Sequence, residues 1–513
     1  MFSLRRTVYL DNNATTKLAP RVARATSRVL RRHYGNPSSL YRTARDAGAI
    51  LEEARHAVAS AINADADEII FTSCATEANN HVLKAVTEIH FPAKRKIVST
   101  PIEHPSVIES LAYLAEHGVE VALLPVDRFG RVRLEALEQA LDARTFLVCC
   151  MLANNELGTI QDVARVARAA RDRGILVMSD CVQALGKVPV DVREIGVDYA
   201  TFSAHKLHGP KGTGAVFVRR GAPLRPFVHG GHQEAGRRAG TEAVHNIAGF
   251  AEACRALPAL LARAGETAAR TRQFGRDLRL IKPDLVINSP DEGCLPNTLS
   301  VTFPGVNNAV LMAALDSRGV AVSAGSACST SETKPSHVLK AIGLSDEAAN
   351  QTIRFSLSAD TSAKDLRYAL RVIRDHLEGK VPAIHALRAS QVDERLLYDP
   401  GNYILDVRFW HERKLLKGLP NSHEASFVSF RRYAHHVPRD KHVIVVCMGG
   451  IDAIAIAYSL KARRYGRVSF LVGGVAAWRL AQPELYAKRA GTNISKLEPR
   501  PGRWWSRPRP DRR

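Results

Sequence analysis

The chain has 513 residues, of which 45% are hydrophobic and 24% charged, a balance that excludes a fibrous or wholly disordered protein. It contains no uninterrupted apolar run of ~18 residues, and its start, MFSLRRTVYL, lacks the apolar region of a secretory signal, so we expect a cytoplasmic protein without membrane contact. The formal net charge of +21 indicates a solvated basic surface or a partner rich in phosphate or carboxylate.

Short β-branched runs alternate with amphipathic segments through the first 220 residues or so. The expected strands are 68–73, 96–100, 120–126, 145–152, 175–180 and 198–205, and the clearest expected helices are 75–90 and 108–118. This alternation predicts an α/β fold with a mostly parallel sheet covered by helices. Functional loops are then expected at the carboxyl ends of the strands.

The remainder of the chain predicts a smaller α/β section and then a separate domain. The pattern is helical from about residue 245 to 280, mixed afterwards, and helical again over 363–378. A linker is expected at 381–397, followed by a second βα series. The basic stretch at 491–513, rich in Arg, Pro and Trp, predicts disorder. Such a tail can also contact nucleic acid, and this alternative stays open.

The strongest local signal for chemistry is SAHKLHGPKGTG at 203–214. Lys206 directly follows an expected strand, lies next to His205, and precedes three glycines that allow close backbone approach. Taken alone, the motif also describes a surface lysine in a glycine-rich turn. A lysine at a strand end of an α/β sheet is, however, where proteins bind pyridoxal 5'-phosphate (PLP) as a Schiff base.

The chain offers the other groups that PLP requires at successive strand ends. These are Asp180 for the pyridinium nitrogen, Gln183 and Asn155 for the phenolic oxygen, Ala75 and Thr76 for the phosphate, and His104 for stacking on the ring. Each has a plainer interpretation, since Asp180 or Thr76 can cap a helix and His104 can be an ordinary loop histidine. Their joint occurrence favours a PLP site.

Residues 7–380 resemble the cysteine desulfurases of the NifS/IscS type, which are PLP enzymes of fold type I. The motifs that carry the resemblance occur in order along the chain: YLDNNATT (9–16), GNPSS (35–39), TEANN (76–80), EHPSV (103–107), NNELGT (154–159), SAHKLHGPKGTGA (203–215), RAGT (238–241), SAGSAC (323–328) and IRFSL (353–357). The resemblance implies a homodimer that converts L-cysteine to L-alanine. It also implies a large domain at about 15–260 and a small domain built from the N-terminal segment and about 261–380.

The resemblance assigns a role to each candidate residue. The cofactor ligands would be Ala75, Thr76, His104, Asn155, Asp180, Gln183, Ser203, His205 and Lys206, with Thr241 supplied by the partner subunit; the substrate ligands would be Asn36, Asn155 and Arg354. Lys206 would form the Schiff base, and His104 would also assist proton transfer. Arg354 would bind the substrate carboxylate as a bidentate fork.

Cys328 lies in SAGSACSTSETKPSHVL (323–339), a stretch of small and polar residues typical of a moving loop. The resemblance makes its thiolate the group that takes the substrate sulfur as a persulfide. The chain has no CxxC pair, so no resident metal site is expected. Cys328 could still ligate an iron–sulfur cluster transiently.

Residues 398–490 resemble a rhodanese domain through YILDVR (403–408), VIVVC (443–447) and FLVGGVAAWRL (470–480). Cys447 ends an expected strand before a glycine loop and a helix, where backbone N–H groups favour a thiolate. Asp452 in this loop opposes it. Two interpretations stay open: Cys447 relays sulfur from Cys328, or it is a structural cysteine in a docking domain. The final acceptor would be an iron–sulfur scaffold or a tRNA-thiolation enzyme.

Overall fold

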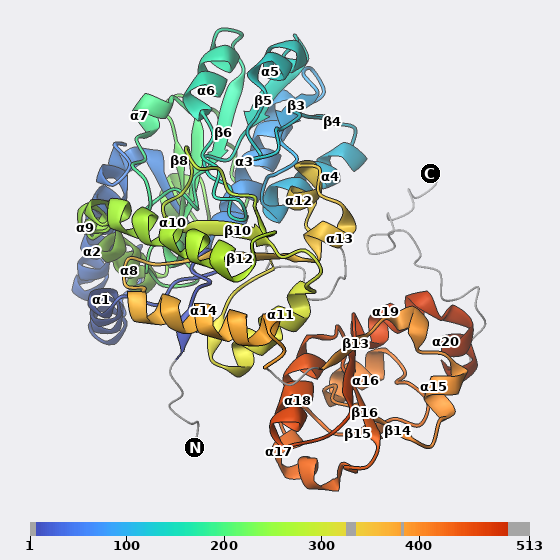
Figure 1. Cartoon of the computed structure of the whole chain (residues 1–513). Coiled ribbons are helices and arrows are strands. Elements are labelled where there is room, and N and C mark those ends of the chain that lie inside the picture. The colour runs from blue at the N-terminus through green and yellow to red at the C-terminus, as the bar shows by residue number, and fades with distance from the viewer. Residues whose placement is uncertain (1–6, 325–334, 381–383, 491–513) are drawn as a thin grey trace, which may run out of the picture. The chain divides into compact units, whose positions relative to one another are not determined.

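The computed structural model describes residues 7–324, 335–380 and 384–490. The chain divides into two compact units, each considered by itself. The first contains the described residues up to Asn308 together with 319–324 and Pro335–Arg374, and the second contains Ala309–Arg318 and the described residues from Asp375 onward. Figure 1 shows both units with their elements labelled. In the part of the chain described, no helix is both long and apolar enough to cross a membrane.

A seven-stranded sheet in the order β2-β8-β7-β6-β5-β3-β4 lies at the centre of the first unit. Its strands are β2 (Ile69–Thr72), β3 (Lys96–Ser99), β4 (Glu120–Leu123), β5 (Thr145–Cys149), β6 (Leu176–Asp180), β7 (Tyr199–Ser203) and β8 (Gly214–Val218). Only β8 runs against its neighbours. The carboxyl ends of the other six strands therefore share one edge, as the βα pattern predicts.

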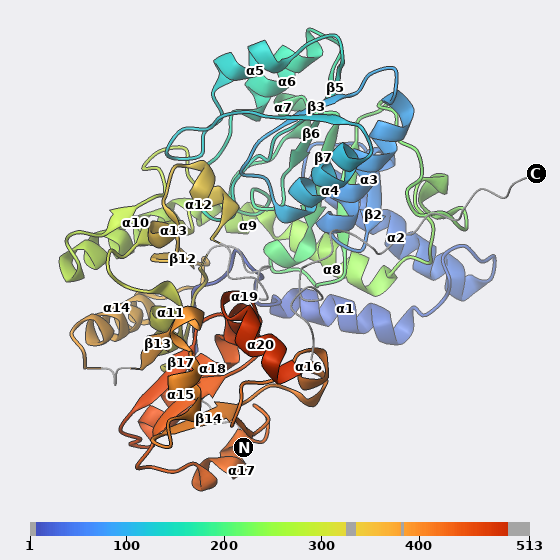
Figure 2. The same ribbon diagram turned by 90° about the vertical axis from the view of Figure 1, so that its right-hand side faces the viewer.

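Alternating side chains place this sheet between two apolar cores. Ile69 and Phe71 face one core, while Ile70 between them faces the other. The first core includes residues of α2 (Arg42–Ser60), α6 (Val163–Arg171) and α8 (Val244–Arg255); the second includes residues of α3 (Ala75–His90) and α4 (Pro105–Glu116). Figure 2 shows α3 and α4 next to each other on their side of the sheet. The result is a three-layer α/β/α arrangement.

Sequence and structure differ in two details of this unit. The expected helix at 108–118 begins earlier, at Pro105 of α4, because proline is well accommodated in the first helical turn. Strand β8 was not among the expected strands, since its short apolar run follows the glycine-rich turn directly. The other six strands lie where the pattern predicts them.

A three-stranded antiparallel sheet, β12-β10-β9, forms the smaller part of the first unit. It consists of β9 (Val286–Ile287), β10 (Thr298–Thr302) and β12 (Thr352–Ser356), with α10 (Ala264–Ile281) and α14 (Ala363–Leu377) nearby in sequence. The N-terminal strand β1 (Val8–Tyr9) pairs with β11 (Val320–Ala321). Asn12 then donates its backbone N–H to Ser356 O at 3.2 Å, so the N-terminal segment reaches the end of β12.

The second unit contains a parallel five-stranded sheet in the order β13-β17-β16-β14-β15. The strands are β13 (His385–Leu387), β14 (Asn402–Asp406), β15 (His423–Glu424), β16 (His442–Val446) and β17 (Val468–Leu471), and the main helices are α15 (Glu394–Tyr398), α18 (Ile451–Ala462), α19 (Gly474–Ala481) and α20 (Pro483–Ala490). Apolar cores lie on both faces. The buried Trp478 donates from Nε1 to Val392 O at 3.0 Å.

Candidate active site

Most of the predicted site residues lie along the shared strand-end edge of the large sheet. Ala75 and Thr76 begin α3 after β2, His104 precedes α4 after β3, Asn155 follows β5, Asp180 ends β6 and Gln183 follows it, and Ser203, His205 and Lys206 come at and after the end of β7. Segments that are distant in sequence therefore converge at one place, as expected for a site on a parallel sheet.

The Asp180 carboxylate is buried and oriented by two donors. Asn79 donates from Nδ2 to Oδ2 at 2.9 Å, and the backbone N–H of Val182 donates to Oδ1 at 3.0 Å. Asn79 is itself fixed, since it also donates to Ser106 Oγ at 2.8 Å and accepts from Thr201 Oγ1 at 2.7 Å. A carboxylate held in a fixed orientation can pair with a protonated ring nitrogen of a cofactor. Asn79 lies in the TEANN motif, but the sequence alone does not reveal that it bonds Asp180.

His104 has a defined tautomer. Its Nδ1 accepts the backbone N–H of Ser106 at 3.1 Å, which caps α4 and leaves the proton of a neutral ring on Nε2. Burial lowers the pKa of His104, and the charges of Lys206 and His337 lower it further, while Asp180 raises it. A neutral imidazole beside a carboxylate and a lysine can stack on a ring or move a proton.

Lys206 lies against the N-terminal segment. Its Nζ donates to the carbonyl oxygens of Asn13 at 2.6 Å and Ala14 at 2.9 Å. Gln183 donates from Nε2 to the same Asn13 carbonyl at 2.9 Å. Asn13 thus joins two predicted cofactor ligands. It belongs to the YLDNNATT motif, but the sequence alone does not reveal which of its residues meets Lys206.

Two observations mark a place for a phosphate group beside α3. The hydroxyl of Ser203 is buried and has no hydrogen-bond partner among the described residues. Ser203 lies opposite Gly214 in the sheet, and a Cβ on Gly214 would lie 2.8 Å from the backbone carbon of Cys74. Cys74 precedes α3 and gives it no side-chain cap. The first N–H groups of α3 and the Ser203 hydroxyl can therefore bind an anion.

His205, another predicted phosphate ligand, lies one residue before Lys206. Its Nδ1 is 3.1 Å from Thr15 Oγ1. Burial lowers the pKa of His205 to about 4, with the charges of Lys206, Lys211 and Lys187 acting in the same direction. A neutral His205 offers a hydrogen bond rather than a charge.

Arg354 lies in β12 and is only 2% exposed. It donates from Nη1 to Asn155 O at 3.0 Å and from Nη2 to Asp11 Oδ1 at 2.7 Å. The predicted substrate ligands Arg354 and Asn155 are therefore neighbours, and Asp11 fixes the guanidinium plane. The role of Asp11 was missed, because its partner lies far away in sequence.

Among the described residues of the first unit, two predicted residues are not joined to this cluster. Asn36 is exposed, and its Oδ1 accepts the backbone N–H of Ser38 at 3.0 Å. Thr241 is exposed in the segment before α8. Cys328 lies outside the described residues, as does the tail at 491–513.

Cys447 follows β16 in the second unit and is 2% exposed. Its Sγ accepts the backbone N–H groups of Gly450 at 3.0 Å and Ala453 at 3.4 Å. Burial nevertheless raises the pKa of Cys447 to about 11; the negative charge of Asp452 raises it as well, and the amides lower it. The expected amide donors are present, but burial outweighs them and favours the thiol. All seven cysteines in the described residues are free.

The chain is similar to known proteins over both parts. Residues 8–368 match the aminotransferase class-V family, and residues 389–481 match the rhodanese-like domain. The first part is 40% identical over 376 residues to a cysteine desulfurase IscS of Dictyoglomus turgidum, which covers 73% of this chain and 95% of that protein. It is 38% identical over 370 residues to a cysteine desulfurase NifS of Azotobacter vinelandii, covering 72% and 91%.

Solved structures show the same similarity. A NifS-like protein superimposes with a TM-score of 0.69 at 40% identity and covers 73% of this chain and 100% of its own. SspA in complex with cysteine superimposes with a TM-score of 0.63 at 32% identity and covers 69% of this chain and 99% of its own.

Proposed function

Because the chain belongs to the class-V aminotransferase family and is a cysteine desulfurase that also carries a rhodanese-like domain, we propose that it binds PLP on Lys206 and transfers the sulfur of L-cysteine to Cys328. The observation that supports this most is the cluster at the sheet edge, where Asp180, Gln183 and Lys206 are each oriented by hydrogen bonds.

The residues fit the cofactor that the family implies. The buried Ser203 hydroxyl, which has no partner among the described residues, and the start of α3 would bind its phosphate. Asp180 would bind the ring nitrogen and Gln183 the ring oxygen, while His104 would cover the ring face. When bound, PLP supplies an electron sink that weakens bonds at the substrate α-carbon. The carboxylate of L-cysteine would bind Arg354 and Asn155.

The sulfur transfer needs no added oxidant. The thiolate of Cys328 attacks the sulfur of L-cysteine, so that an S–S bond forms as the C–S bond breaks. The carbon keeps the electron pair in the form of a new C–H bond and leaves as L-alanine. Cys328 then carries a persulfide. The neutral His104 ring would assist the proton transfer that forms this C–H bond.

We further propose that Cys447 receives this sulfur by thiol–persulfide exchange before an acceptor protein takes it. The second domain keeps the acceptor thiol at a high effective concentration near the donor. The acceptor would be an iron–sulfur scaffold or a tRNA-thiolation enzyme in the cytoplasm. The working form would be a homodimer with Thr241 reaching the partner's site. The second domain would begin at β13, earlier than the expected residue 398, because β13 pairs with β17 in its sheet.

Mass spectrometry of the protein after exposure to L-cysteine tests these assignments. We expect one added sulfur on Cys328 and one on Cys447 in the native sequence. In Cys328→Ser, we expect no added sulfur on Cys447. In Cys447→Ser, Cys328 should still gain sulfur and alanine release should persist. Cys254→Ala, which changes a buried cysteine on α8 that has no role in the proposed mechanism, is the control. Alanine release that survives Cys328→Ser overturns the mechanism, and a protein without a visible PLP band overturns the cofactor assignment.

A further inference from the structure

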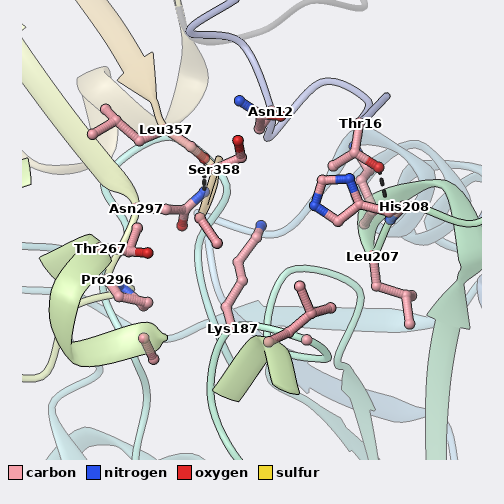
Figure 3. A pocket seen from close by; sticks show the side chains of 15 residues that line it. Asn12, Thr16, Lys187, Leu207, His208, Thr267, Pro296, Asn297, Leu357 and Ser358 are labelled. Carbon is pink, nitrogen blue, oxygen red and sulfur yellow. Dashed lines mark hydrogen bonds between the residues drawn. The ribbon is translucent and has the colours of Figure 1, made fainter. Parts of the chain in front are cut away.

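A second lysine lies beside the predicted cofactor ligands, and the proposed function leaves it without a role. Lys187 is 9% exposed. Its Nζ donates to Asn13 Oδ1 at 3.0 Å and also to Gln183 Oε1. Figure 3 shows the Lys187 side chain extending into a pocket, which Asn297 and Lys206 also line. Asn297 donates from Nδ2 to the same Asn13 oxygen at 3.0 Å.

These contacts fix the Gln183 amide from both ends. A lysine Nζ has at least two N–H bonds whether it is charged or neutral, and here both meet oxygen acceptors. At the other end of the amide, Gln183 Nε2 donates to the carbonyl of Asn13. If the amide rotated by 180°, its oxygen would face the Asn13 carbonyl, and its NH₂ group would face the Lys187 donors. The observed orientation is therefore the only one that both neighbours accept.

Burying a lysine at this position is energetically unfavourable. Burial lowers the pKa of Lys187 well below its ordinary value, and the positive charges of Lys206 and Arg354 lower it further. Desolvation of such a group lowers the free energy of unfolding, and the hydrogen bonds to Asn13 and Gln183 offset part of that loss. A lysine at this position is therefore explained by the amide that it orients rather than by its own burial.

We infer that Lys187 is a positioning residue for the cofactor: it holds the Gln183 amide so that one N–H of Nε2 remains directed to Asn13 and the other serves the cofactor's ring oxygen. This inference rests on the proposed PLP site. Lys187 would act on the cofactor through Gln183, by determining that the amide nitrogen of Gln183 faces the ring oxygen.

The test compares Lys187→Met, Gln183→Ala and the double variant in the full-length protein, with Lys364→Met as the control because Lys364 is exposed on α14. Each protein is freed of PLP and titrated with it, and the PLP dissociation constant and the visible spectrum are recorded. We expect Lys187→Met to raise the dissociation constant about tenfold and to shift the absorption band. The double variant should be no weaker than Gln183→Ala, since both changes act through one amide.

Thermal unfolding of the PLP-free proteins separates positioning from support of the fold. Lys187→Met should lower the unfolding temperature no more than Gln183→Ala does, since both variants break the Lys187–Gln183 hydrogen bond. A much larger fall in the unfolding temperature, an unchanged dissociation constant and spectrum, or additive losses in the double variant each overturn the inference. If the native sequence binds PLP while Lys187→Met behaves identically, only this inference fails. If the native sequence binds no PLP, the proposed function fails and this inference fails with it.

Discussion

Asn79 donates a 2.9 Å hydrogen bond to Asp180, linking the first turns of α3 to the end of β6. The two residues are about a hundred positions apart in sequence, and both are buried. The bond fixes the carboxylate that we assign to the ring nitrogen of PLP.

Replacing Asn79 by alanine should therefore weaken PLP binding without unfolding the protein. A lost hydrogen bond to a charged group corresponds to roughly a tenfold or greater rise in the PLP dissociation constant. Fluorescence titration of PLP-free protein measures it. Asn80→Ala is the matched control, because Asn80 is the next residue on α3, is only partly buried, and donates to the Thr76 carbonyl of its own helix. Equal affinities for the two variants would contradict the role of Asn79.

Replacing Arg354 by lysine should raise the KM for L-cysteine more than it lowers kcat. Lysine keeps the positive charge but loses the planar fork that meets Asp11 and Asn155 at the same time. We expect a KM increase on the order of tenfold or more. Steady-state alanine release measures both constants, with the exposed Arg367→Lys on α14 as the control. An unchanged KM would remove Arg354 from the substrate site.

The sequence reveals polar residues that lie at the ends of predicted strands. It does not reveal residues that act by orienting another side chain. The strand-end positions of Lys206 and Asp180 could be predicted, because each residue comes at the end of an apolar run that the alternation predicts as a strand. Asn79, Asn13 and Lys187 could not, since their partners come from remote segments that only the folded sheet brings together.

The sequence predicts hydrogen-bond donors better than it predicts pKa values. The amide donors to Cys447 could be predicted, because a strand, a glycine loop and a helix follow one another in the sequence. The burial that raises the pKa of this thiol depends on packing and could not be predicted. Strand β8 was missed for a different reason: its five residues follow the glycine-rich turn after Lys206 directly, with no helical segment before them to continue the βα alternation.

Glu103 should make the stability of the first unit depend on pH. Burial raises the pKa of this carboxyl to about 7 from 4.5, because desolvation outweighs the donors Met151 N and Thr100 Oγ1. The folded protein keeps the proton that the unfolded chain releases above pH 4.5, so stability is lost as the pH rises from about 4.5 to about 7.

Glu103→Gln removes this titration while preserving shape. We expect similar stability to the native sequence near pH 5 and a gain at pH 8 of up to about 3 kcal/mol, an upper bound from the shift in pKa. Urea unfolding at the two pH values measures it. Glu109→Gln, exposed on α4, should show no such difference. A gain of equal size at both pH values would contradict titration of Glu103 as the cause.

Asp452 should control how readily Cys447 reacts. After burial, its negative charge is the main influence that raises the pKa of Cys447 to about 11, so at neutral pH the sulfur is almost entirely a thiol. Asp452→Asn removes that charge and should lower the pKa, giving a roughly threefold to tenfold faster alkylation of Cys447 by iodoacetamide near pH 8.

Peptide-level mass spectrometry across a pH series, in a Cys328→Ser background, isolates the Cys447 reaction. The profile of Asp452→Asn should move to lower pH, while that of Asp440→Asn, an exposed carboxylate elsewhere in the unit, should match the parent. If Cys447 relays sulfur, Asp452→Asn should also speed the appearance of sulfur on Cys447 in the protein that retains Cys328, because only the thiolate attacks a persulfide. Faster alkylation without faster sulfur transfer would show that Cys447 reacts as a thiolate but does not lie on the path of the sulfur.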